Sequence, residues 1–199
     1  MRREFFEIPA RERRPGRFSI LVFGGSQGAH AINEAMIAAL PFLKNLKDEL
    51  RLTHQTGEAD FAKVNARYAE SIWREHATVR KYIDNMVEAF AEVDLVICRA
   101  GATTTAELNR RRQGVGNDSF PLAADDHQRK NAEALEAAGA GKMILQQDLS
   151  GERLAQEITT LVHEPEKIST MEQAARKLAR GDAAAAVVEM VEKLVGNDK

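Results

Sequence analysis

The sequence contains little of what marks secreted, membrane-spanning or nucleic-acid-binding proteins. Cys98 is its one cysteine, which excludes a disulfide framework within the chain and suits a reducing cytosol. No apolar run approaches the roughly 18 residues that span a bilayer. Charged residues follow Met1, so no signal peptide is predicted. The formal net charge of −2 gives no basic footprint for nucleic acid, and no basic amphipathic helix predicts direct membrane contact.

What is present is typical of a globular domain. Of the 199 residues, 44% are hydrophobic and 29% are charged, a balance that supports a sizeable core. Short apolar runs alternate with segments of helical periodicity, which predicts a doubly wound, Rossmann-like parallel sheet of the α/β class. The predicted strands are residues 18–23, 51–55, 78–83, 94–98 and 143–146. The predicted helices are residues 32–40, 61–72, 86–90, 104–108, 131–138, 150–162, 165–179 and 182–194.

The first segment differs in character from the rest of the chain. Residues 1–17 are rich in Arg, Glu and Pro without a clear period and are predicted to be an interdomain linker. Residues 18–199 are predicted to form the domain with its closing helices. Asp84 or Asn85 is expected to cap the helix that follows them, and Gly139 is expected to end a later helix.

A glycine-rich loop follows the first predicted strand. It contains Gly24, Gly25, Ser26, Gln27 and Gly28. Glycine permits positive φ and a close backbone approach, and the N-terminus of the next helix is suited to a phosphate. The alternative is a tight strand-to-helix turn without a ligand. Because ligands of such sheets bind beyond the carboxyl ends of the strands, the loops after residues 23, 83 and 98 are expected to share one rim.

A second loop, residues 99–107, repeats this design after the fourth predicted strand. Gly101 opens the turn, and hydroxyl groups follow at the start of a helix. Two such loops on one rim are suited to the two ends of a nucleoside diphosphate. Glu107 is placed to accept hydrogen bonds from both ribose hydroxyls. The alternative is that Thr103 caps the helix and Glu107 is a solvated acid of its first turn.

A third polar cluster precedes the helix predicted at residues 131–138. Gln128 is suited to hydrogen bonds with sugar hydroxyls, and His127, beside two acidic residues, suggests a metal ligand or a general base. No second histidine stands at ligand spacing, so no metal is predicted. Asp125 or Asp126 is expected to cap the helix. His54 and Gln55, at the end of the second strand, either form part of the rim or only satisfy loop backbone.

A nicotinamide-dependent dehydrogenase is disfavoured by two features. The first loop reads Gly-Gly-x-x-Gly rather than Gly-x-Gly-x-x-Gly. The second strand runs into residues 53–57 without the acidic residue that holds an adenosine ribose.

Five strings in this order carry a family resemblance: FGGSQGA, HQTG, YIDNM, ICRAGATTTAE and AADDHQRKNAEAL. Together they resemble the MurG family of undecaprenyldiphospho-muramoylpentapeptide N-acetylglucosaminyltransferases, over nearly the whole chain. The resemblance implies the C-terminal half of a two-domain GT-B enzyme, with this half binding UDP-N-acetylglucosamine (UDP-GlcNAc). The N-terminal half of the family binds the lipid I acceptor. Two alternatives stay open: a related UDP-sugar enzyme such as a UDP-GlcNAc epimerase, and a non-catalytic nucleotide-binding module.

The resemblance also implies an activity and a location. N-acetylglucosamine would pass to lipid I with inversion, forming lipid II for peptidoglycan and cell wall synthesis, and so serving cell shape and division. No cofactor or metal is implied, and the candidate base lies in the N-terminal half, so no catalytic residue is expected here. The location would be cytoplasmic, with the full-length enzyme peripheral on the inner membrane. The isolated chain is expected to bind the donor and to transfer nothing.

The residue roles below are those that the resemblance implies. The backbone of Ile83 would meet the uracil edge, with Met86 nearby, and Glu107 would hold the ribose. Gln128, with His127 beside it, would face the sugar. Arg2 matches an interdomain arginine near the donor. The diphosphate would meet Ser26, Ala102, Thr103, Thr104 and Thr105.

Residues 109–119 depart from the family pattern. The family has small apolar residues and then an Ile- and Val-rich strand, whereas this segment reads NRRRQGVGNDS. A central strand of that composition is disfavoured. A double frameshift in the gene is one explanation, and genuine residues would weaken the strand.

Overall fold

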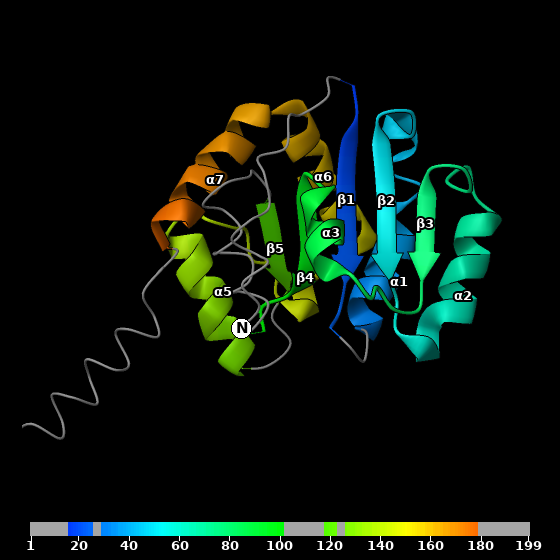
Figure 1. The fold of residues 1–199 in the computed structure, drawn as a ribbon, viewed down its shortest axis with the longest axis horizontal. Coiled ribbons are helices and arrows are strands. Elements are labelled where there is room, and N and C mark those ends of the chain that lie inside the picture. Colours follow the sequence, from blue (N-terminus) through cyan, green and yellow to red (C-terminus); the bar gives the residue numbers. More distant parts are fainter. Residues whose placement is uncertain (1–15, 26–28, 102–117, 123–125, 179–199) are drawn as a thin grey trace, which may run out of the picture.

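The computed structural model describes residues 16–25, 29–101, 118–122 and 126–178. Its centre is a five-stranded sheet in the order β3-β2-β1-β4-β5, and every neighbouring pair of strands is parallel. The strands are β1 (Phe18–Phe23), β2 (Leu50–Gln55), β3 (Ala77–Arg80), β4 (Leu95–Arg99) and β5 (Asp118–Leu122). The predicted doubly wound α/β class is confirmed (Figure 1).

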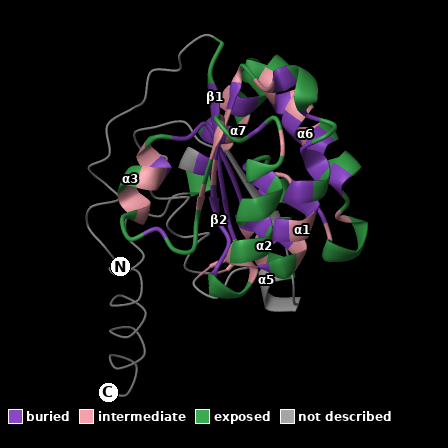
Figure 2. Ribbon diagram, turned by 90° about the vertical axis from the view of Figure 1, so that its right-hand side faces the viewer, coloured by how far each residue is buried: buried purple, intermediate pink, exposed green. Residues whose placement is uncertain are grey.

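Helices lie on both faces of this sheet. Figure 2 shows the sheet from its edge, with α3 on one side and α1, α2 and α6 on the other. Among the described residues, no helix has the length and apolarity that a membrane crossing requires. The helices are α1 (His30–Ala39), α2 (Glu58–Ala69), α3 (Met86–Ala91), α5 (Asp126–Ala137), α6 (Gly151–His163) and α7 (Pro165–Leu178), with short 3-10 turns η2 (Lys44–Leu46) and η3 (Gln146–Asp148).

Alternation along β1 divides the core into two layers. Ile20 and Val22 join the larger cluster beneath α1 and α6, while Leu21 and Phe23 pack on the other face against Phe90 of α3. The rings of Phe23 and Phe90 meet edge to face with centroids 5.7 Å apart. Burial on both faces explains why this strand is a continuous apolar run in the sequence.

Two strand predictions need correction. The third strand ends at Arg80 and does not reach Ile83, which leaves Ile83 in the loop beyond it. The late strand at residues 143–146 is wrong: the segment has no strand and continues into η3. The reason is that the Met143 N–H donates to the Glu136 carboxylate, so a side chain takes the backbone donor that a ladder would use.

β5 forms in the segment where the sequence disfavoured a strand. Asp118 pairs with Leu95 and Pro121 with Cys98 in parallel register. β5 has one partner, β4, among the described strands, and such an edge position tolerates proline and polar residues that a central strand rejects. Residues 109–117 lie outside the described residues, as do residues 1–15 and the helices predicted at 104–108 and 182–194.

Two predicted helix caps are confirmed, although α2 ends at Ala69 rather than at residue 72 and α5 begins at Asp126 rather than at residue 131. Asn85, rather than Asp84, caps α3 by accepting from the Glu88 N–H at 3.2 Å. Gly139 ends α5 with a φ of 68°, and its N–H donates to the Glu136 carbonyl while that of Ala140 donates to Leu135. This pair of bonds is the Schellman arrangement, which favours glycine.

Replacing Gly151 by alanine should destabilise the fold. Gly151 begins α6 where it crosses α1, and an added Cβ would lie 2.6 Å from the carbonyl oxygen of Ala38. Because that neighbour is backbone, the helices must move apart, at a cost of about 1–3 kcal/mol. Urea unfolding measures the loss. Glu152→Ala, an exposed change at the next position, should stay within about 0.5 kcal/mol, and equal effects of the two changes would contradict the close packing.

Candidate functional site

The carboxyl ends of β1, β2, β3 and β4 meet at one edge of the sheet, because all four strands are parallel. The loops that leave this edge begin at Gly24, Thr56, Lys81 and Ala100 (Figure 1). Since the chain winds from β1 towards β2 but from β4 towards β5, the loops after β1 and β4 diverge. This is the crevice where open α/β sheets bind ligands, and the predicted shared rim is confirmed for the described residues.

The first loop runs directly into the N-terminus of α1. Gly25 has a φ of 88°, which favours glycine. Ala29 directly precedes α1, and its carbonyl accepts a hydrogen bond from the Asn33 N–H in the first turn of the helix. Ala29 offers no side-chain cap, and the first turn of α1 has no acidic residue. The Asp60 carboxylate of α2 contacts the side chains of His30 and Asn33 in this turn, while the backbone N–H groups at the positive end of the helix dipole are suited to an anion.

Gln55 links this loop to the loop after β3. Its Nε2 donates to the Gly25 carbonyl at 3.0 Å, and its Oε1 accepts from the Ile83 N–H at 2.8 Å. The side chain is 2% exposed. The sequence left two alternatives for Gln55, a part of the rim or a residue that satisfies loop backbone, and both of its hydrogen bonds are to the backbone of loops that form the rim. The signal for this role in the sequence was a polar residue at the end of a predicted strand.

Ile83 and Met86 lie together at the base end of the rim. The Ile83 side chain is buried among Leu21, Phe23 and Phe90, and Met86 packs against the same cluster. The N–H of Ile83 is bound by Gln55. The segment between β3 and α3, residues 81–85, is called the base loop below, and residues 24–29 are called the phosphate loop, after the ligand groups that the sequence predicts for them. The base loop stands beside Gly24 and Gly25 of the phosphate loop, across the end of β2.

The second glycine turn is tied to α5. Asn131 donates from its Nδ2 to the Ala100 carbonyl at 3.0 Å, directly before Gly101. Because His127 and Gln128 lie one turn earlier on α5, their backbone stands near the loop that leaves β4.

The structure therefore gathers part of the predicted site at one edge. Gly24, Gly25, Ile83, Met86 and Gly101 lie there, and His127 and Gln128 are placed by backbone alone. The other predicted residues lie outside the described ones: Arg2, Ser26, Gln27, Gly28, Ala102, Thr103, Thr104, Thr105 and Glu107. Within the described stretches, no three His, Cys, Asp or Glu side chains come together as a metal site would need.

A buried polar network anchors the elements behind the phosphate loop. Asn33 of α1 donates both Nδ2 hydrogens, to the Thr56 carbonyl and the Asp60 carboxylate. Its Oδ1 therefore accepts from His54 Nε2, 2.9 Å away, which fixes the Nε2–H tautomer. The Tyr68 hydroxyl then donates to Nδ1 at 3.2 Å.

Burial sets the ionisation of this network. It lowers the pKa of His54 to about 4, against an opposing effect of the Asp60 carboxylate. It also raises the pKa of Tyr68 above its usual range. Burial alone would raise the pKa of Asp60, but hydrogen bonds from Asn33 and His30 and the nearby cationic groups lower it. His54 is thus a neutral structural residue rather than a rim residue.

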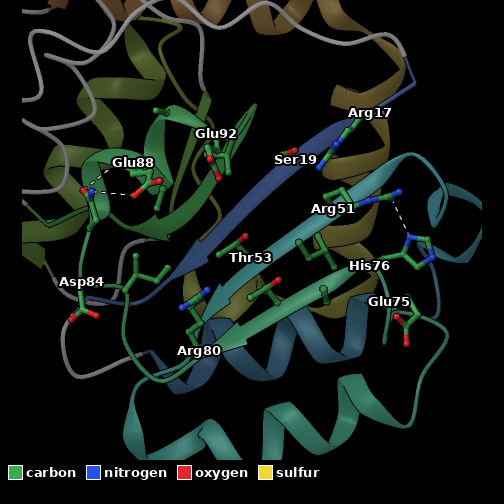
Figure 3. A pocket seen from close by; sticks show the side chains of 18 residues that line it. Arg17, Ser19, Arg51, Thr53, Glu75, His76, Arg80, Asp84, Glu88 and Glu92 are labelled. Atoms are coloured by element: carbon green, nitrogen blue, oxygen red, sulfur yellow. Dashed lines mark hydrogen bonds between the residues drawn. The ribbon is translucent and has the colours of Figure 1, made fainter.

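A groove of about 1310 Å³ lies on the sheet face that α3 covers in part. In Figure 3, Thr53 and Arg80 extend from β2 and β3, and Glu88 and Glu92 lie across from them. The groove reaches Ile83 at the base loop, but none of the described phosphate-loop residues, Gly24, Gly25 and Ala29, lines it. Because the groove is lined by side chains of both charge signs, it favours neither an anionic nor a cationic ligand. The rim therefore remains the candidate site.

Comparison with known proteins shows the family of this chain. The model of the glycosyltransferase family 28 C-terminal domain matches residues 19–187. A relative from Geobacter sp. (strain M21) is 52% identical over 92% of this chain and 49% of its own length. One from Citrifermentans bemidjiense is 51% identical over 88% and 49%. Both are named UDP-N-acetylglucosamine--N-acetylmuramyl-(pentapeptide) pyrophosphoryl-undecaprenol N-acetylglucosamine transferase. The chain spans about half the length of these relatives.

Solved structures agree with the sequence comparison. The crystal structure of Acinetobacter baumannii MurG has a TM-score of 0.77 at 34% identity, covering 95% of this chain and 55% of that one. The UDP-GlcNAc 2-epimerase from Neisseria meningitidis bound to UDP-GlcNAc has a TM-score of 0.61 at 12% identity, covering 90% and 45%, and shows the fold alone. The resemblance drawn from the five sequence strings is confirmed.

The buried histidine predicts a loss of stability in mild acid. The unfolded chain binds the His54 proton near pH 6.5 and the folded chain near pH 4. The stability tied to neutral His54 is therefore complete above pH 6.5 and is lost as the pH falls towards 4. In His54→Gln the unfolding free energy should depend less on pH across this window, by about 1 kcal/mol per pH unit. Urea unfolding at several pH values measures the slopes. Equal slopes would contradict a buried neutral imidazole.

Proposed function

Because the chain belongs to the glycosyltransferase family 28 C-terminal domains, we propose that it is the donor-binding half of an inverting N-acetylglucosaminyltransferase. The donor is UDP-GlcNAc and the acceptor is lipid I, which yields lipid II for peptidoglycan. The observation that carries the proposal is the rim, where a phosphate loop at a helix N-terminus and a base loop stand on either side of Gln55. Their neighbours in sequence supply the hydroxyl and carboxylate groups that a UDP-sugar needs.

The proposed donor lies along the rim from the base loop to α5. Uracil meets the backbone carbonyl of Ile83, because the Ile83 N–H already donates to Gln55, and Met86 lies beside it. Glu107 accepts from the two ribose hydroxyls, and Gln128 faces the sugar. The diphosphate meets the start of α1 and the turn after Gly101, whose N–H groups and hydroxyls suit an anion.

The proposed chemistry is a direct displacement at the anomeric carbon. The acceptor C4 hydroxyl attacks, the bond to UDP breaks, and the configuration inverts. Charge grows on the leaving diphosphate, and backbone N–H groups already directed at that position stabilise it without reorganisation. The base that takes the acceptor proton is assigned to an N-terminal half, along with lipid I binding. The proposed setting is the cytoplasmic face of the inner membrane, in cell wall synthesis that serves cell shape and division.

The ribose role of Glu107 is tested with a pair of ligands. We expect UDP to bind at least about tenfold more tightly than 2′-deoxy-UDP, since a charged hydrogen bond contributes about 1.5–3 kcal/mol. In Glu107→Ala the two ligands should bind alike. Calorimetric titration measures both, with Glu70→Ala, an exposed acid at the far end of α2, as the control.

Three outcomes bear on this proposal. Loss of the preference in Glu107→Ala alone supports the ribose role. A preference that persists in Glu107→Ala overturns it. Preferential binding of NAD over UDP-GlcNAc by the unchanged chain would overturn the donor assignment itself.

The 199-residue chain alone should transfer nothing. It lacks the acceptor-binding groups and base that the proposal assigns to an N-terminal half. Radiolabelled UDP-GlcNAc incubated with lipid I should give no labelled lipid, while addition of a full-length relative supplies the positive control. Turnover by the isolated chain would show that the chemistry needs no further half.

A further inference from the structure

Gln55 occupies a position from which one side chain reaches two loops. β2 lies between β1 and β3, and Gln55 is the last residue of β2, paired with Phe23 on one side and Arg80 on the other. Both neighbouring strands end at this level. The side chain of Gln55 therefore stands between the two chain segments that leave the sheet next to it.

The two hydrogen bonds require an amide in one orientation. The Gly25 carbonyl can only accept a hydrogen bond, so its partner must be the Nε2 donor of Gln55. The Ile83 N–H can only donate, so its partner must be the Oε1 acceptor. A carboxylate would lack the donor, and an apolar side chain would lack both groups. With 2% of its surface exposed, the amide has little access to water as a replacement partner, so loss of either bond is costly.

The two loops are held differently near these bonds. Among the described residues, an added Cβ at Gly25 would have no neighbour within 4 Å, whereas the Ile83 side chain is buried among Leu21, Phe23 and Phe90. Ile83 lies three residues beyond the end of β3. The backbone ladder continues past β3 only through the Thr56 and Gly57 N–H groups, which donate to Arg80 and Lys81. Within the part of the chain that the structure describes, Gln55 is thus a direct polar link between Gly25 of the phosphate loop and Ile83 of the base loop.

We propose that Gln55 is a positioning residue that sets the separation of these loops and so couples binding of the uracil and diphosphate ends of the donor. The inference rests on the proposed function. A ligand that spans two subsites gains affinity only when their spacing matches its length. Without the link each subsite survives, but their separation is no longer fixed, and the advantage of the joined ligand falls.

The measurement is the ratio of the dissociation constants of uridine and UDP. Gln55→Met keeps the length of the side chain and removes both hydrogen bonds. We expect this ratio to fall at least about tenfold, the effect of roughly 1.4 kcal/mol, in Gln55→Met. Gln55→Asn, which keeps the amide but is too short to span both loops, should show the same fall and serves if Gln55→Met does not fold.

A structural role alone predicts a different result. General destabilisation lowers the folded fraction and weakens both ligands equally, so the ratio stays constant. Tyr68→Phe is the matched control, because it removes the buried hydrogen bond to His54 behind the rim without touching either loop. Its melting temperature should fall while its ratio remains that of the unchanged chain.

The outcomes test the role of Gln55 separately from the proposed function. A fall in the ratio in the Gln55 variants but not in Tyr68→Phe supports coupling. An unchanged ratio in a folded Gln55 variant, or an equal fall in Tyr68→Phe, overturns the inference and leaves the proposed function intact. An unchanged chain that binds neither ligand overturns the proposed function, and the inference with it.

Discussion

The parallel pairing of β1 with β4 is the constraint on which the rest of the structure depends. Leu95 to Cys98 and Ile20 to Val22 are fully buried, so the two strands form the centre of both core layers. At their amino ends Ser19 and Asp94 are joined twice, because the Ser19 N–H donates to the Asp94 carboxylate and the Asp94 N–H donates to the Ser19 carbonyl. At their carboxyl ends the chain turns to opposite sides. That divergence makes the crevice in which the proposed donor lies.

The polar interior supports this edge from behind. The network of Asn33, His54, Asp60 and Tyr68 joins α1, β2 and α2, and α1 carries the phosphate loop at its N-terminus. Each buried group has its partner, which is the condition under which a buried network rigidifies a fold. A neutral His54 is required because its two ring nitrogens have one donor and one acceptor role to fill. The position of α1 therefore depends on a protonation state as well as on packing.

The sequence predicted those elements whose cause is local. β1 and β4 are apolar runs buried on both faces, and Gly139 and Ser150 end or begin helices by bonds to residues within a few positions. β5 was not predictable in this way, since its edge position, which makes Asp118 and Pro121 tolerable, is a property of the assembled sheet. The prediction of a strand at residues 143–146 was wrong for a similar reason, because the Met143 N–H donates to the Glu136 carboxylate, a contact that local sequence does not reveal.

The site shows the same division. The glycine loops follow from strand, turn and helix order, and their described residues, Gly24, Gly25 and Gly101, lie at the predicted edge of the sheet. Gln55 and His54 adjoin each other in one string, yet their side chains point to the rim and to the interior, respectively. Gln55 differs from His54 through its hydrogen-bond partners Ile83 and Gly25, which lie 28 and 30 residues away in the sequence. No periodicity carries that information, because it depends on which strands become neighbours.

The distribution of acidic groups along the rim gives the proposed ligand a direction. The base loop contains the exposed Asp84, and the first turn of α3 contains Glu88, whereas the first turn of α1 contains no acid. A diphosphate placed at the base loop would meet like charge, while at α1 it meets the positive end of a helix. A neutral nucleobase meets no repulsion from these acids at the base loop. Lys81 of the base loop and the Asp60 carboxylate beside the first turn of α1 reduce this charge difference, so orientation also depends on the Gln55 link that fixes the distance between the two ends.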